Sequence, residues 1–380
     1  MNTPPFQGVW HPGGSLGHRQ FATLFEGALE LEAGGRLAPV DVAYETWGSL
    51  DPSRSNAVLV LHALSGDSHA AGPAGPGHPT PGWWDGLIGP SAPIDTSRFF
   101  VVCPNVLGGC QGTTGPASPA PDGLPYGSRF PAITIRDQVA VEAALADHLG
   151  IDRWAAVIGG SMGGMRALEW CIGHPERVQR GILLAVGAVA TAEQIGLCSL
   201  QVRAIRADPA FRGGDYYYSG GRPAAGLAIA RGIGQMSYRT ADELEARFNN
   251  AQQSTDDPLN RGRYAVESYL EHHGDKLASR FDPNSYVVLS EAMSHHDVGR
   301  GRNGLASALS QIVATMTVAG ISSDRLYPLK LQYEIASLLP SHTEVGVIDS
   351  LIGHDGFLVE VSGVGNVVLA ALARDGARNL

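Results

Sequence analysis

The sequence predicts an α/β protein with a mostly parallel sheet and an inserted helical lid. Short apolar runs typical of buried strands alternate with helical patterns over most of the chain, and this alternation favours parallel strands joined by helices. One run enters a Gly-x-Ser-x-Gly sequence and continues directly into a helical pattern. The alternation stops for a long helical stretch and resumes towards the C-terminus.

The predicted strands are short and dominated by apolar residues. We expect them at residues 40–46, 57–61, 99–103, 155–158, 181–186, 312–319 and 344–348. Residues 135–149 place Val139, Ala143, Ala146 and Leu149 on one helical face, as expected for a crossover between parallel strands. Further helices are expected after residue 161, ending near residue 174, and from residue 329 to 339.

The lid is predicted at residues 188–303, between core segments 1–187 and 304–380. Its helical stretches are rich in Arg, Glu and Gln and are broken by glycine pairs. Because strand-like runs resume at residue 312 and candidate catalytic residues lie on both sides, a lid is a simpler interpretation than a separate interaction domain. Residues 70–93 and 108–129 are expected to form long ordered loops.

Composition excludes several classes of partner. The formal net charge is −10 and only two lysines occur, Lys276 and Lys330, which argues against binding nucleic acid or an anionic membrane. No apolar run approaches membrane-spanning length and the N-terminus lacks a signal-peptide pattern, so we expect a soluble cytoplasmic protein. Its four cysteines lack a CxxC pair, which favours buried thiols over disulfides or zinc.

The Gly-x-Ser-x-Gly sequence is typical of a nucleophile elbow. An apolar strand precedes it and a helix follows, so the turn would present the Ser161 hydroxyl at the carboxyl edge of the sheet. Glycines on both sides permit the sharp turn. A glycine-rich turn with an ordinary serine is the alternative, but the flanking strand and helix favour a catalytic Ser161.

Chain order restricts the search for the other catalytic groups. In this architecture a carboxylate follows the serine and a histidine comes last. Asp324 follows a β-rich run directly, at the carboxyl end where catalytic groups gather. His354 lies in the loop after the next predicted strand. Neither residue would stand out alone, but together they complete a Ser161–Asp324–His354 set in the expected order.

Two backbone N–H groups are candidates for an oxyanion hole. One follows the nucleophile directly and belongs to Met162. The second comes from the loop after an earlier strand, where we assign Leu64. In this loop Ala63 and Leu64 replace the consecutive glycines of the lipase pattern.

Several longer blocks make the chain resemble the homoserine O-acetyltransferases of the α/β-hydrolase superfamily, which acylate homoserine on the route to methionine. The blocks are residues 62–69, 105–116, 159–164, 230–239, 323–328 and 353–358, and the resemblance covers nearly the whole chain. It implies Ser161 as nucleophile, Asp324 as orienting acid and His354 as general base, the same residues that chain order selects.

The resemblance also implies a substrate site and a reaction. Arg231 would bind the amino-acid carboxylate, for which a guanidinium fork is well suited, Asp355 would pair with the ammonium group, and Tyr238 would line the same pocket. The implied reaction transfers acetyl from acetyl-CoA to the hydroxyl of L-homoserine through an acyl-serine, in ping-pong order. It uses acetyl-CoA as co-substrate and needs no metal or prosthetic group. A homodimer formed through the lid is also implied.

Alternatives remain open on the sequence alone. An esterase-type serine hydrolase would share the elbow, base and acid. Within the family, succinyl-CoA as donor or serine as acceptor would use the same motifs. A catalytically silent binding protein would retain the fold, although the intact Ser161, Asp324 and His354 argue against it.

Overall fold

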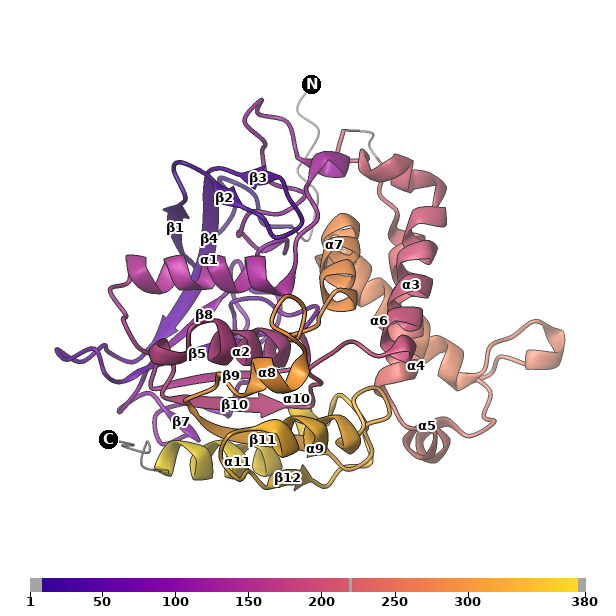
Figure 1. The fold of residues 1–380 in the computed structure, drawn as a ribbon. Coiled ribbons are helices and arrows are strands. Elements are labelled where there is room, and N and C mark those ends of the chain that lie inside the picture. The colour runs from indigo at the N-terminus through magenta and orange to yellow at the C-terminus, as the bar shows by residue number, and fades with distance from the viewer. Residues whose placement is uncertain (1–8, 219–220, 375–380) are drawn as a thin grey trace.

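A computed structural model describes residues 9–218 and 221–374 of the chain. Its central sheet has eight strands in the order β1-β4-β8-β5-β9-β10-β11-β12, and from β8 to β12 neighbouring strands are parallel. The mostly parallel sheet is therefore confirmed (Figure 1).

The strands are β1 (Gln20–Leu24), β4 (Val40–Trp47), β5 (Ala57–Leu61), β8 (Phe100–Pro104), β9 (Ala156–Gly160), β10 (Arg180–Leu184), β11 (Thr315–Ile321) and β12 (Val345–Ile348). Two small two-stranded sheets pair β2 (Leu29–Glu30) with β3 (Arg36–Leu37), and β6 (Ile88–Gly89) with β7 (Ile94–Asp95).

The sequence pattern did not predict strand β1. This edge strand pairs antiparallel with β4, which in turn pairs antiparallel with β8. Only two of its five residues are buried, so it lacks the continuous apolar run that marks the inner strands. Its pairing with β4, rather than its own sequence pattern, therefore identifies β1 as a strand.

Helices cover both faces of the sheet. All five residues of β5 are buried, with Leu59 and Leu61 in the core cluster that includes Leu168 of α2 (Met162–Gly173). Val58 and Val60 belong to the cluster on the other face, together with α11 (Val361–Ala373). The remaining core helices are α1 (Ile135–His148), α8 (Leu305–Leu309), α9 (Leu329–Leu338) and α10 (Gly356–Val359). Burial on both faces explains why the parallel strands read as unbroken apolar runs.

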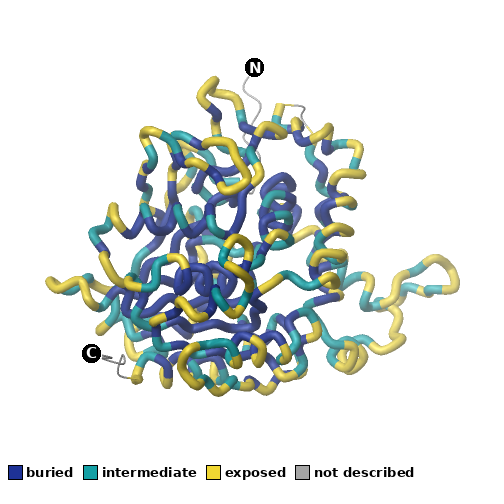
Figure 2. Tube along the Cα trace, in the orientation of Figure 1, coloured by how far each residue is buried: buried dark blue, intermediate teal, exposed yellow. Residues whose placement is uncertain are grey.

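Five described helices lie between β10 and α8, beside the sheet (Figure 1). They are α3 (Ala192–Ala207), α4 (Ala224–Tyr238), α5 (Ala241–Phe248), α6 (Ala265–Arg280) and α7 (Pro283–Ser294). Helix α4 packs against both α3 and α6, whereas α5 and the segment leading to α6 project from the body and are largely exposed (Figures 1 and 2). Short 3-10 turns occur at Gly127–Arg129, Pro175–Arg177, Pro209–Gly214 and Pro258–Asn260.

The described helices and thiols bear on two expectations. Within residues 9–218 and 221–374, none of the helices has the length and hydrophobicity needed to span a bilayer. Cys103, Cys110 and Cys171 are buried as expected, while Cys198 is half-buried, and all four are free thiols.

Candidate active site

Ser161 lies at a sharp turn between β9 and α2. Its backbone adopts φ 54° and ψ −124°, a conformation with positive φ that is costly for a residue with a Cβ. The turn depends on its glycines, because a Cβ at Gly163 would lie 2.0 Å from the Leu61 carbonyl oxygen and one at Gly159 would lie 2.1 Å from the Gly163 oxygen. The sequence thus specifies a close approach between the strand, the helix and the neighbouring strand β5, with the serine at the apex.

The structure brings Ser161, His354 and Asp324 together from three loops at the carboxyl edge of the sheet. His354 Nε2 is 2.8 Å from Ser161 Oγ, and His354 Nδ1 is 2.6 Å from Asp324 Oδ2. The side chains of His354 and Asp324 are 4% and 0% exposed. This continuous chain of hydrogen bonds has the geometry needed to move a proton from the serine hydroxyl to the imidazole.

Asp324 is oriented by its own loop. Its Oδ1 accepts the backbone N–H groups of Leu326 and Tyr327, each at 2.8 Å, which leaves Oδ2 for His354. The Tyr327 ring also stacks on the imidazole, with centroids 4.9 Å apart and planes at 24°, and Phe357 meets the imidazole by its edge at 5.4 Å. The His354 imidazole is therefore held in position by ring contacts with both Tyr327 and Phe357.

The candidate oxyanion donors come from the start of α2 and from the loop after β5. Met162 is fully buried and is the first residue of α2, where backbone N–H groups have no partner within the helix. Leu64 lines the cavity that contains Ser161. Its loop starts at His62, whose carbonyl oxygen accepts a hydrogen bond from the buried Arg166 of α2. The nucleophile helix and the Leu64 loop are thus joined directly.

Ser161 opens into a cavity of about 370 Å³ between the core and the helices α3, α4 and α6. Arg231 of α4 lines this cavity, with its guanidinium carbon 5.4 Å from the centroid of the Tyr238 ring. Asp355 lines it too and is paired with Arg239, whose Nε is 3.4 Å from the carboxylate. All three predicted substrate-binding residues therefore face the same space as the serine.

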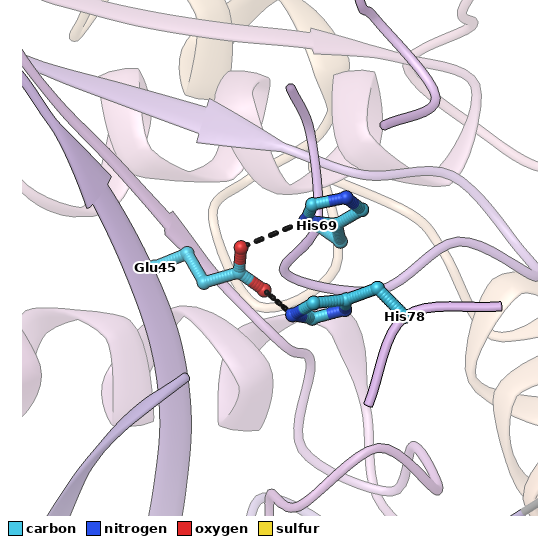
Figure 3. A group of neighbouring side chains, drawn as sticks. All are labelled: Glu45, His69 and His78. Carbon is cyan, nitrogen blue, oxygen red and sulfur yellow. Dashed lines mark hydrogen bonds and ion pairs between the residues drawn. The ribbon is translucent and has the colours of Figure 1, made fainter. Parts of the chain in front are cut away.

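One group of described side chains has the residue types of a metal centre. Glu45 of β4 and the loop residues His69 and His78 have potential ligand atoms within 4.8 Å of one another (Figure 3). His69 Nδ1 lies 2.9 Å from one Glu45 oxygen, and His78 Nε2 lies 3.5 Å from the other. However, the two rings stack 3.8 Å apart at 11°, so their lone pairs lie in nearly parallel planes, and His78 Nε2 already accepts the backbone N–H of His18 at 3.1 Å. These contacts describe a hydrogen-bonded wall of the cavity rather than a coordination sphere.

Sequence reasoning missed several residues around this cavity. Tyr327 lies within one of the family-like blocks but had no role assigned, and its stacking on His354 depends on the fold of its loop. Arg280 and Lys276 of α6 also line the cavity. No motif marks Arg280, because its contacts are with the loop after β5, far away in the sequence.

Comparisons with known proteins agree with this architecture. The family profile described as alpha/beta hydrolase fold matches residues 56–361. A homoserine O-acetyltransferase from Thermobifida fusca is 57% identical over 375 residues, which cover 98% of this chain and 99% of that protein.

Solved structures extend the comparison. The homoserine O-acetyltransferase from Bacillus anthracis matches with a TM-score of 0.87 and 29% identity over 94% of this chain and 98% of that one. An acetylester hydrolase from Corynebacterium glutamicum matches with a TM-score of 0.79 and 27% identity over 94% of this chain and 96% of that one. The chain belongs to the homoserine O-acetyltransferase family of α/β-hydrolase-fold acyltransferases.

Proposed function

We propose that this protein is an L-homoserine O-acetyltransferase that transfers acetyl from acetyl-CoA through an acyl-enzyme on Ser161, in methionine biosynthesis. The observation that carries the proposal is the hydrogen-bonded chain from Ser161 to His354 to Asp324, opening into a cavity that also holds Arg231. The family resemblance supports the choice of substrates, since the 57% identical relative bears that name.

In the first half-reaction His354 takes the proton of Ser161 Oγ as the oxygen attacks the thioester carbonyl. The tetrahedral intermediate carries its negative charge on the former carbonyl oxygen, towards which the N–H groups of Leu64 and Met162 would donate. Asp324 stabilises the imidazolium that forms and keeps the unprotonated Nε2 directed at the serine. Collapse of the intermediate breaks the carbon–sulfur bond, CoA leaves with the proton from His354, and an acetyl-serine remains.

In the second half-reaction homoserine occupies the vacated space. Arg231 would hold its carboxylate through charge-assisted hydrogen bonds, and Asp355 would attract its ammonium group. His354 removes the proton of the substrate hydroxyl, and the hydroxyl oxygen attacks the acetyl carbon. As the bond between this carbon and Ser161 Oγ breaks, the imidazolium returns the proton to Oγ and O-acetylhomoserine is released. Side chains and backbone N–H groups that already surround the cavity carry every step, so the proposed reaction requires no metal or prosthetic group.

Transfer to an alcohol rather than to water requires positioning and exclusion of solvent. The helices α3, α4 and α6 supply Cys198, Arg231 and Lys276 to the walls of the cavity. Homoserine fixed at both of its charged ends would place its hydroxyl at the acyl-serine, whereas water has no such anchors. The amino-acid site therefore supports a transferase over an esterase with the same triad.

Two finer expectations belong to the same proposal. A homodimer formed through the lid is supported by exposed apolar side chains on α3 and α4, with Ile195, Leu200, Ile229 and Met236 between 40% and 59% exposed. Sedimentation of the purified protein at several concentrations tests it, and a monomer throughout would contradict it. We propose a cytoplasmic location because the acetyl donor and the amino-acid acceptor are metabolites of that compartment.

The direct test is release of CoA thiol from acetyl-CoA, with and without L-homoserine. We expect turnover that depends on homoserine and disappears in Ser161→Ala. Release that ignores the acceptor would identify an esterase-type hydrolase. Preference for succinyl-CoA or for L-serine would move the protein to a related activity with the same mechanism.

A further inference from the structure

We propose that Arg280, the last residue of lid helix α6, is a positioning residue that fixes the Leu64 backbone N–H for the transition state of acyl transfer. This inference rests on the proposed function, because it assigns a role within the same reaction. It follows from direct contacts between the lid and the turn that carries the second oxyanion donor.

Leu64 lies at a corner of a tight turn. The backbone N–H of Gly66 donates to the carbonyl oxygen of Ala63 at 2.7 Å, so Leu64 and Ser65 are the two central residues. This hydrogen bond closes the turn but does not fix its tilt relative to Ser161. Contacts from outside the turn are therefore needed to set the direction of the Leu64 N–H.

Arg280 makes such a contact with both of its terminal nitrogens. Nη1 donates to the Ser65 carbonyl oxygen at 2.9 Å, and Nη2 lies 3.2 Å from the Ser65 hydroxyl. On the opposite side, Arg166 of α2 donates to the His62 carbonyl oxygen just before the turn. One guanidinium from the core thus contacts the residue before the turn, and one from the lid contacts its second central residue.

The position of Arg280 is itself well determined. Its carbonyl oxygen accepts the side-chain amide of Gln111 at 3.2 Å, and the next residue, Phe281, is 2% exposed. Asp282 then caps α7 by accepting the Ser285 N–H at 2.9 Å. The chain around Arg280 is therefore anchored to the core loop and to the next lid helix.

Burial makes the contact costly to replace. Burial lowers the pKa of the Arg280 guanidinium, and the neighbouring Asp67 carboxylate opposes that change. A planar guanidinium can satisfy the two Ser65 acceptors at once with two nitrogens, whereas the ammonium of a lysine is a compact point charge without that planar fork. The geometry therefore requires arginine at this position rather than any cation.

The consequence is a mechanical link between the lid and the chemistry. If α6 moves or loses Arg280, the turn keeps its internal hydrogen bond but the Leu64 N–H is no longer held towards the reacting oxygen. Misplacement of a reacting or stabilising group by about 1 Å can reduce a rate on the order of 10²-fold. Arg231, around which the proposed homoserine site is built, lies on a different lid helix and is not part of this contact, although its charge acts on the Arg280 guanidinium across the shared cavity.

The test measures single-turnover acylation of Ser161 in Arg280→Gln, with acetyl-CoA and with S-acetyl-N-acetylcysteamine, a neutral short thioester. We expect the acylation rate to fall about 10²-fold with both donors, while the KM for homoserine changes by less than about threefold. Arg280→Lys should also acylate slowly. Added guanidinium ion should partly restore the acylation rate of Arg280→Gln and leave the wild-type rate unchanged.

A matched control and clear contrary outcomes accompany this test. Arg263→Gln removes another lid arginine, one that pairs with Glu271 of the same helix α6 away from the turn, and should leave acylation unchanged. A loss confined to acetyl-CoA would make Arg280 a contact for the charged donor and overturn the proposal, as would acylation within about threefold of wild type for both donors.

Folding and activity are separated by design. Circular dichroism and thermal melting establish that each variant is folded. If Arg280→Gln does not fold, Arg280→Lys, which keeps the charge, decides the question by the same two rates. Wild-type protein that forms acyl-Ser161 but does not acetylate homoserine would overturn the proposed function alone, and the acylation rates would still test Arg280.

Discussion

Asp324→Asn tests whether Asp324 orients the His354 imidazole, because the substitution keeps the histidine but changes its hydrogen-bond partner. In the native protein Asp324 Oδ1 accepts two backbone N–H groups at 2.8 Å, and Oδ2 accepts the His354 Nδ1 proton at 2.6 Å. An asparagine would direct its carbonyl oxygen at the two N–H groups, because the reverse orientation would place amide hydrogens against them. Its NH₂ group would then donate to His354 Nδ1, which would have to be unprotonated.

This substitution therefore moves the imidazole proton to Nε2. Because Nε2 faces Ser161 and then already carries a proton, it cannot accept the proton of the serine. We expect kcat to fall by about 10⁴-fold with little structural change, equivalent to about 5.4 kcal/mol of transition-state stabilisation. The assay is CoA-thiol release with homoserine, with thermal melting to establish folding. Asp349→Asn is the control, since Asp349 is exposed and its carboxylate accepts a hydrogen bond from the Ser322 hydroxyl. A fall below about tenfold would refute the orientation argument.

Three further predictions address the acceptor site, the elbow and the dependence on pH. Arg231→Gln should raise the KM for homoserine by about 10- to 100-fold, because it removes charge-assisted hydrogen bonds worth roughly 1.5–3 kcal/mol. Acyl-enzyme formation should stay near the wild-type rate. Equal losses in both half-reactions would contradict the assigned role. Gly163→Ala should abolish activity and lower the melting temperature, because its Cβ would lie 2.0 Å from the Leu61 oxygen. An active, equally stable variant would show that the turn tolerates a side chain. Burial lowers the pKa of His62 to about 3, with the Arg166 charge adding to the effect, and lowers the pKa of His296 to about 4. Both folded pKa values are depressed, so the stability these neutral imidazoles contribute is present above about pH 6.5 and is lost as pH falls towards 4, by about 4 kcal/mol in total between pH 7 and pH 5. Urea unfolding of the wild type and His296→Gln at these two pH values checks the slope, which should be smaller in the variant; equal slopes would contradict it.

The local sequence pattern was sufficient to predict the features that depend on local backbone geometry and on the order of the strands. The elbow is recognisable because the positive φ of Ser161 and the close approach at Gly163 require specific neighbours in the chain. Asp324 and His354 could be selected because parallel strands bring their carboxyl ends to one edge, so chain order carries spatial information. The structure then supplies the distances that order alone could not.

Contacts between distant segments were not predictable in the same way. The antiparallel edge strand β1 is half-exposed and short, so its sequence differs little from that of a loop. Arg280 lies 215 residues from its partner Ser65, and their contact depends on how α6 packs against the loop after β5. The stacked pair of His69 and His78 likewise arises from packing against Glu45 of a distant strand. Tertiary docking, rather than periodicity or motif, determines all three.

The central claim is that Ser161 carries the acetyl group between the two substrates. Protein mixed with acetyl-CoA in the absence of homoserine, quenched in acid and digested, should yield the peptide containing Ser161 with one added acetyl group. Addition of L-homoserine before quenching should remove the label and produce O-acetylhomoserine in equal amount, and Ser161→Ala should never be labelled. An unlabelled Ser161 in protein that nevertheless acetylates homoserine would contradict the acyl-enzyme mechanism.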